Sequence, residues 1–403
     1  MQKLNIPLIL LSLSGVVGAG EPDVVPPAPS EPAASLFKIK GDIRGRYEFY
    51  ETDPLDASHA LTVRARLGLL FGEMNGFSAY VEGEGTEAII DDFNTPGGST
   101  PKAPGNSAIA DPDNAELNQA YLKYAANGFM TQVGRQRIIR NNAAFIGNVG
   151  WRQNEQTFDA AQVGYKADSY SASYAYADRA QRIFGADAGG ALEEFDGAIH
   201  LLDASFDTSF GTLGGYAYLI DIDNNANVGE SNTFGAFGKS GDIYAEFAFQ
   251  DGRSAFAGGD YDALYGHLKY SAKLGGSSVS AGVEYLGENF KTPLATVHAF
   301  NGFADAFIGQ RLGLNNKGGS YDGITDFYLG YVQAGLPYGI TFKGFLHLFM
   351  DGKMDDVYGY EADAVLVKKF NDKLTGLVKA SYFVGEDYYD DVKQLSFQLD
   401  CKF

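Results

Sequence analysis

The segment at residues 390–403, DDVKQLSFQLDCKF, alternates polar and apolar side chains up to a final phenylalanine. Strict alternation over this length is typical of the closing strand of a bacterial outer-membrane β-barrel. An edge strand of a soluble β-domain is the alternative that this segment alone leaves open. The apolar face carries Leu395, Phe397, Leu399, Cys401 and Phe403. Because Cys401 lies on this face and is the only cysteine, we interpret it as a small hydrophobe and expect no disulfide.

The first residues favour export. Lys3, an apolar run over residues 8–17 and the small residues Val17 and Ala19 predict a signal peptide at residues 1–19. Residues 20–36 are rich in proline and alanine, which predicts an extended linker. We assign residues 37–403 to a single β-barrel.

The formal charge of -20 argues against a nucleic-acid partner, since proteins that bind nucleic acids present basic surfaces.

Period-2 alternation continues through the rest of the chain. It is clear over residues 37–51, 61–71 and 77–84, and it returns in later runs. Many runs have about nine to thirteen residues, the length that a tilted strand needs to cross a bilayer. The sequence predicts an antiparallel transmembrane barrel of about 18 strands, correct to within about two. The weakest runs are residues 129–138, 198–206 and 231–239.

Connection lengths also favour a membrane barrel. Short, turn-like segments such as GEMNG (residues 72–76) and AANG (residues 125–128) alternate with long ones. The long connections cover residues 89–116, 139–156, 179–197 and 287–321. Short periplasmic turns and long external loops are the usual layout of such barrels.

Basic side chains are the most informative polar set. Arg44, Arg46, Arg64 and Arg66 alternate with apolar residues on two successive runs, so we expect them to face the lumen as cross-strand neighbours. Guanidinium groups suit carboxylates, and rings of basic residues line anion pores. The predicted anion path comprises Arg44, Arg46, Arg64, Arg66, Lys123, Arg135, Arg137 and Arg152. A purely structural ion-pair network remains open, because Glu82, Glu84, Glu246, Glu284, Glu361 and Asp363 are also predicted to point inward.

Signals for catalysis are weak. His298 and Asp305 share one external loop, but no nucleophile motif frames them. The five histidines are too scattered for a metal site with recognisable spacing, and no nucleotide-binding glycine motif occurs. We therefore expect no enzyme activity, no metal and no cofactor.

Four segments resemble the alginate-export family of outer-membrane barrels. They are GRQRI (residues 134–138), GNVGWRQNEQTFDA (residues 147–160), HAFNGFAD (residues 298–305) and GGSYDGITDFYLGY (residues 318–331). The resemblance implies an eighteen-stranded monomeric barrel with an arginine-rich lumen that passes a polycarboxylate. It matches Arg135, Arg137 and Arg152 to family arginines.

Together these features predict a channel of the bacterial outer membrane for anionic saccharides or an alginate-like polyuronate. A non-conducting barrel that serves as an adhesin, receptor or structural anchor is the alternative. The expected partners are outer-membrane lipid and lipopolysaccharide, the anionic saccharide cargo and a periplasmic export or uptake partner. The direction of transport is left open.

Overall fold

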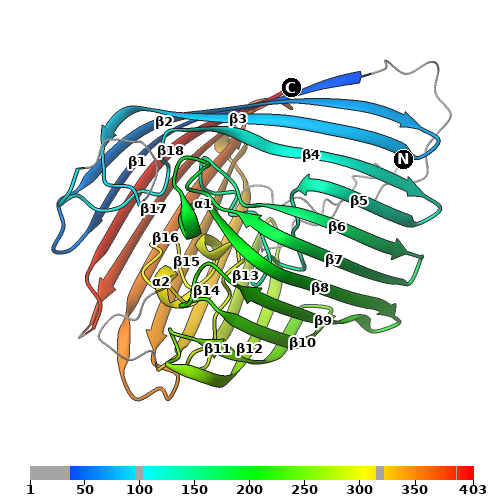
Figure 1. Cartoon of the computed structure of the whole chain (residues 1–403). Coiled ribbons are helices and arrows are strands. Elements are labelled where there is room, and N and C mark those ends of the chain that lie inside the picture. The colour runs from blue at the N-terminus through cyan, green and yellow to red at the C-terminus, as the bar shows by residue number, and fades with distance from the viewer. Residues whose placement is uncertain (1–36, 97–102, 315–321, 387) are drawn as a thin grey trace, which may run out of the picture.

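The computed structural model describes residues 37–96, 103–314, 322–386 and 388–403. Eighteen strands form one antiparallel sheet that closes on itself, because β1 pairs with both β2 and β18 (Figure 1). The strands are β1 (Phe37–Thr52), β2 (Ser58–Met74), β3 (Phe77–Asp92), β4 (Asn114–Ala126), β5 (Phe129–Gln136), β6 (Thr157–Lys166), β7 (Tyr170–Gln181), β8 (Glu194–Thr208), β9 (Gly211–Ile222), β10 (Glu230–Ser240), β11 (Ile243–Ser254), β12 (Gly259–Leu274), β13 (Ser277–Leu286), β14 (Ile324–Leu336), β15 (Ile340–Met350), β16 (Val357–Lys369), β17 (Leu374–Gly385) and β18 (Val392–Lys402).

Alternation decides which face of each strand looks outward. Large apolar side chains such as Leu67, Leu122 and Phe247 are exposed on the outside of the barrel. The polar side chains that alternate with such residues along the strands, such as Arg64 and Arg66, are buried inside it. Apolar groups outside and polar groups inside reverse the usual arrangement of a soluble protein and match a barrel surrounded by lipid. The predicted fold class and the strand count of eighteen are confirmed. The three weakest predicted runs are strands β5, β8 and β10.

Local turn chemistry explains the short connections at one end. The β2–β3 turn has Asn75 and Gly76 at φ 53° and 85°, and the β4–β5 turn has Asn127 and Gly128 at φ 52° and 79°. Asn-Gly in the left-handed region is the preferred two-residue hairpin turn, because its twist matches that of the strands. We take this end as periplasmic and the opposite end, with the long loops, as external.

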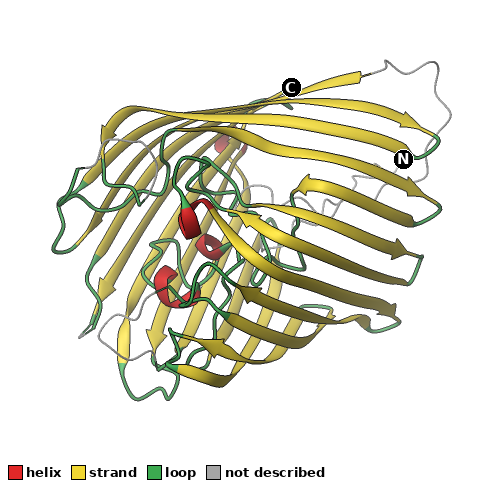
Figure 2. Ribbon diagram, in the orientation of Figure 1, coloured by secondary structure: helices red, strands yellow, loops and turns green. Residues whose placement is uncertain are grey.

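Two long loops fold into the barrel rather than away from it. We call residues 137–156 the first inner loop and residues 287–314 the second inner loop. The second contains two short helices, η1 (Val297–Ala299) and α2 (Ile308–Arg311), while helix α1 (Gly190–Glu193) precedes β8. Figure 2 shows loop segments and short helices within the ring of strands. No helix among the described residues is long and apolar enough to cross a membrane.

The inner loops bury their apolar side chains against one wall of the barrel. Phe145 and Ile146 of the first loop and Phe290 and Leu294 of the second pack with inward residues of β8 to β13, including Tyr265. The Phe145 ring lies 5.0 Å from Tyr265 and 5.9 Å from Phe290 between centroids. This cluster is a hydrophobic core inside the lumen, and it fixes the depth of both loops. The predicted signal peptide and linker (residues 1–36) lie outside the described residues.

Candidate functional site

The two inner loops are joined to each other by backbone contacts. The Gly147 amide donates to the Leu294 carbonyl at 2.8 Å, and the Gln156 side-chain amide donates to the same oxygen at 2.9 Å. The Val149 amide donates to the Thr296 hydroxyl at 3.0 Å. These bonds satisfy backbone groups that would otherwise be buried without partners. The loops therefore form one unit that narrows the lumen.

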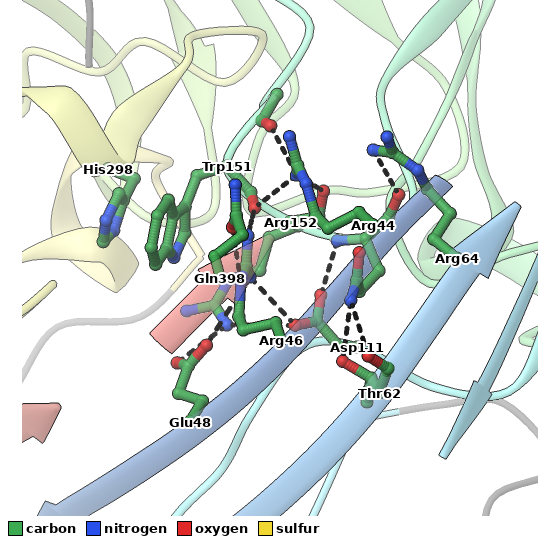
Figure 3. A network of polar contacts seen from close by, with 12 residues as sticks. Arg44, Arg46, Glu48, Thr62, Arg64, Asp111, Trp151, Arg152, His298 and Gln398 are labelled. Atoms are coloured by element: carbon green, nitrogen blue, oxygen red, sulfur yellow. Dashed lines mark hydrogen bonds and ion pairs between the residues drawn. The ribbon is translucent and has the colours of Figure 1, made fainter. Parts of the chain in front are cut away.

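Trp151, the only tryptophan of the chain, lies where the loops meet (Figure 3). Its ring is stacked on His298 of the second loop, with 4.7 Å between centroids and 9° between planes. The Arg46 guanidinium carbon lies 3.9 Å from the Trp151 ring centroid, and the Lys379 ammonium nitrogen lies 3.4 Å from it. Cations over an aromatic face are attracted to its negative quadrupole. Trp151 thus connects both loops with the barrel wall.

Arg44 and Arg46 of β1 bind the first loop through its carbonyl oxygens. Arg44 donates to the carbonyls of Gly150 and Trp151, at 3.1 Å each, and to Asp400 at 2.8 Å. Arg46 also donates to the Trp151 carbonyl, and it contacts the Gln398 side-chain oxygen at 2.7 Å.

The charge of Arg46 is balanced on two sides. Its guanidinium lies 3.3 Å from Asp111 and 3.5 Å from Glu48. Asp400 and Gln398 belong to β18, so the contacts of Arg44 and Arg46 also cross the seam where the barrel closes. Arg44 and Arg46 therefore join the first inner loop to both the first and the last strand.

Arg64 and Arg66 of β2 continue the same arrangement. Arg44 and Arg64 are direct cross-strand neighbours. Arg64 pairs with Asp42 at 2.5 Å, and Arg66 pairs with Glu84 and lies 3.3 Å from Glu155. Both also donate to the Gln153 carbonyl of the first loop, at 3.4 and 3.3 Å.

The four wall arginines are closed off from solvent. Arg44, Arg46, Arg64 and Arg66 are 5%, 1%, 1% and 8% exposed. Each has a carboxylate partner and at least one loop carbonyl. The anion path through these arginines stays a prediction, and their burial among carboxylates matches the ion-pair network that the sequence left open. Guanidinium groups can lie side by side here because each one pairs with a carboxylate and donates to a carbonyl oxygen.

Arg137 and Arg152 belong to the first inner loop itself. Arg152 lies 3.1 Å from Glu48 and 3.4 Å from Asp305 of the second loop. Burial would lower the pKa of Arg152, but Glu48, Asp111 and Asp305 raise it above its ordinary value. Arg137 pairs with Glu155, and its side chain is 35% exposed. It is therefore one member of the predicted set that remains partly open.

Glu155 is the acidic centre of the first loop. Its carboxylate contacts Arg66 and Arg137 and accepts from the Asn118 side chain at 2.8 Å. Burial would raise the pKa of Glu155, but Arg137 and Arg66 lower it well below its usual range. Asn148 also donates to it at 2.7 Å, and a charged carboxylate with four donor residues is a fixed structural anchor.

Lys123 and Arg135 differ from the other members of the predicted set. Lys123 is half-buried on β4 and faces Gln132 across the ladder, on the inward side. Arg135 follows the exposed Val133 by two residues, so alternation places it on the outer face. There it forms a 2.7 Å ion pair with Asp159. The prediction that Arg135 lines the lumen is therefore wrong, because the inward positions of β5 are those of buried Gln132 and Gln136, and Arg135 alternates with them.

Carboxylates of β13 and β16 hold the second inner loop. Glu361 of β16 accepts from the backbone amides of Phe303 and Ala304 at 2.5 and 2.8 Å. Glu284 of β13 accepts from Asn301 at 3.0 Å and pairs with Arg311 at 3.1 Å. The second loop therefore donates to the wall, whereas the first loop mainly accepts from it.

His298 and Asp305 make the contact expected of a catalytic pair, but in a buried position. The His298 Nδ1 atom lies 2.8 Å from Asp305, and its Nε2 atom meets the Lys379 ammonium. Burial lowers the pKa of His298 to about 4, so a neutral imidazole donates to Asp305 and accepts from Lys379. Burial would raise the pKa of Asp305, but His298 and Arg152 lower it. His298 therefore links Asp305 of its own loop with Lys379 of β17.

Sequence reasoning missed Trp151, Asp111, Glu155 and Asn301 as parts of this site. Two of the motifs that carry the family resemblance contain Trp151, Glu155 and Asn301, which was the available signal. Asp111 lies in another long connection and had none. No group of three potential metal ligands was found among the described residues.

Comparisons with known proteins support the fold. The alginate export family model matches residues 37–177, which confirms the resemblance over that part of the chain. No curated protein matches the sequence.

Solved barrels match almost the whole chain in structure. OccAB4 of Acinetobacter baumannii has a TM-score of 0.67 at 12% identity and covers 92% of this chain and 99% of its own. OccK9 (OpdG) of Pseudomonas aeruginosa has 0.66 at 14%, covering 91% and 98%. OpdK of the same organism, determined with vanillate, has 0.66 at 12%, covering 91% and 98%. The chain is a bacterial outer-membrane β-barrel with a porin-type fold.

Proposed function

We propose that this barrel is an outer-membrane channel that passes anionic saccharides, including polyuronates of the alginate type. The observation that carries the proposal is the pair of inner loops, which narrow the lumen together, the first held by β1 and β2 and the second by β13 and β16. A narrowed lumen with fixed charges is how a barrel of this size selects solutes. The resemblance over residues 37–177 supports an acidic saccharide as cargo. OpdK, determined with vanillate, gives a carboxylate precedent among barrels of similar fold.

The wall arginines take an indirect part in this proposal. Arg44, Arg46, Arg64 and Arg66 hold the first loop and set its position, because carboxylates and carbonyls occupy their donors. Arg137 and Lys123, which are partly accessible, are the members of the predicted set that we propose to meet passing anions.

Planar-bilayer recording tests the channel and its cargo together. We expect anion-selective conductance that oligouronates reduce and that weakens in selectivity at high salt, where fixed charges are screened. The Arg137→Glu variant should shift the reversal potential toward cations. A cation-selective pore that ignores oligouronates would overturn the cargo while leaving the channel intact.

A closed barrel is the second candidate, and the inner loops also favour it. Their apolar cluster with β8 to β13 fills part of the lumen, and such a plugged barrel would serve as an adhesin, receptor or anchor. Liposome swelling separates the two functions. Solute flux through the wild-type protein excludes the closed barrel. An absence of flux even in the Arg46→Ala variant supports it.

A further inference from the structure

One stretch of the inner wall, on the periplasmic side of the inner loops, combines lysines with aromatic rings. Phe237 and Lys239 of β10, Tyr244 of β11, Lys269 of β12 and Tyr328 of β14 occupy inward positions there. We call these five residues the lysine–tyrosine patch. Lys239 is exposed and the other four are half-buried. None of them is among the residues that hold the first inner loop on β1 and β2.

Strand register brings the members of the patch side by side. Lys239 pairs with Tyr244 across β10 and β11, and Tyr244 pairs with Lys269 across β11 and β12. Neighbouring strands lie about 4.8 Å apart, so Lys239 and Lys269 occupy the inward positions on either side of Tyr244. The Tyr244 ring is also stacked near Phe237, with 6.3 Å between centroids and 27° between planes.

A glycine allows Tyr328 to lie flat on the wall. Gly282 of β13 stands between Lys269 and Tyr328 in the ladder, and any Cβ atom at this position would collide with the Tyr328 ring. The Tyr328 hydroxyl lies 2.8 Å from His267 Nε2, which fixes the ring. An aromatic ring laid over an in-strand glycine presents its other face to the lumen.

The patch lies near the periplasmic end of the barrel. Lys239 is followed within two residues by the short β10–β11 turn, and Lys269 lies five residues before the end of β12 at Leu274, beside the β12–β13 turn. These are the turns of the periplasmic end. The inward carboxylate of Glu246 is occupied by the hydroxyls of Tyr216 and Tyr244, at 2.7 and 2.6 Å. The patch is therefore a basic, aromatic surface at the periplasmic side of the narrowing.

We infer that the lysine–tyrosine patch is a binding subsite for an acidic oligosaccharide that enters from the periplasmic mouth. Lysine ammonium groups attract uronate carboxylates as point charges, and flat aromatic faces accept the C–H faces of pyranose rings. The alternation of one cation, one ring and one cation along the ladder fits a chain with a carboxylate on each sugar. This inference rests on the proposed anionic-saccharide function and specifies where such a cargo first binds.

Calorimetry on the detergent-solubilised barrel tests the subsite without requiring conduction. The probes are a galacturonate hexamer and the neutral maltohexaose. We expect the hexagalacturonate association constant to fall about fivefold in the double variant Lys239→Gln/Lys269→Gln, with a weaker dependence on salt. Lys402→Gln is the matched control, because Lys402 lies at the same end on another wall and pairs with Asp42 at 3.7 Å. That variant should bind as the wild type does.

The aromatic part has its own variant. Tyr328→Leu should weaken hexagalacturonate binding, while Tyr328→Phe should retain it, because the ring face is kept. Equal affinity of the double lysine variant and the wild type, or equal loss in Lys402→Gln, overturns the inference. If the wild-type barrel binds hexagalacturonate at the patch but passes no current, the proposed channel fails and the subsite stands. If the barrel conducts anions and the patch variants bind unchanged, the channel stands and the subsite fails.

Discussion

The two inner loops perform the same task with opposite chemistry. The first loop is held by its carbonyl oxygens, which accept from arginines of β1 and β2. The second is held by its donors, namely two backbone amides, Asn301 and Arg311, which face carboxylates of β13 and β16. An arginine presents five donors, so one side chain serves several carbonyls at once. The first loop therefore depends mainly on donors of the wall, and the second depends mainly on its own donors.

The comparison predicts the largest effect at Arg46. Arg46→Ala leaves two buried carboxylates, Glu48 and Asp111, to share Arg152, and it removes a donor to the Trp151 carbonyl. We expect a loss of about 3–5 kcal/mol in the free energy of unfolding, measured in urea from lipid vesicles, since breaking a buried ion pair leaves an uncompensated charge. Arg46→Lys should be intermediate. Wild-type stability of Arg46→Ala would mean that the first loop does not depend on this wall side chain.

The second loop should be sensitive at its own Arg311. Arg311→Ala removes contacts with Glu284 and Asn301 and one with the Ala144 carbonyl of the first loop. The expected loss is roughly 2–3 kcal/mol, the range of hydrogen bonds to charged groups, with faster proteolysis within residues 287–314. Arg253→Ala is the control, because Arg253 is largely exposed on the outside and pairs only loosely with Asp260. Equal behaviour of the two variants would contradict the donor role of the second loop.

Acid should separate the loops at the Trp151–His298 stack. The pKa of His298 falls from 6.5 to about 4 in the folded protein, so the unfolded or released loop binds the proton more readily. Stability of the contact is therefore full above pH 6.5 and declines as pH falls toward 4, by about 1.4 kcal/mol per pH unit.

Trp151 is the only tryptophan, so its emission reports this change directly. We expect a reversible emission shift between pH 6.5 and 4 in the wild type and its absence in His298→Gln. A pH-independent emission in both proteins would show that the stack does not respond to the protonation of His298.

The smallest effect on the free energy of unfolding is expected at Gln153, where the wall arginines bind the backbone carbonyl and not the side chain. Gln153→Ala loses the 2.8 Å bond from its side chain to the Thr62 hydroxyl but keeps the carbonyl that Arg64 and Arg66 use. We expect a loss of about 1 kcal/mol in urea unfolding, the worth of one ordinary hydrogen bond. A loss as large as that of Arg46→Ala would show that the first loop, too, is held by its own side chains.

The sequence predicted the wall of the barrel far better than its contents. Alternation and Asn-Gly turns are local signals, and they were enough for eighteen strands and for the cross-strand pairing of Arg44 with Arg64. The position of the inner loops depends on contacts between residues far apart in the chain, such as Arg46 with Trp151. Alternation does not report which carboxylate or carbonyl will neutralise an arginine. Arg135 was misplaced because β5 is the shortest strand, so its weak alternation did not show that Arg135 shares a face with outward Val133.

The seam between β1 and β18 has a consequence for assembly. Asp400 and Gln398 of β18 accept hydrogen bonds from Arg44 and Arg46, and these two arginines also donate to carbonyls of the first loop. β18 is the last strand along the chain, so the loop finds its full set of wall contacts only when the cylinder is sealed. Closure of the barrel therefore completes the attachment of the constriction. Before β1 and β18 pair, Arg44 and Arg46 lack Asp400 and Gln398, and the first loop depends on β2 and on its apolar cluster with β8 to β13.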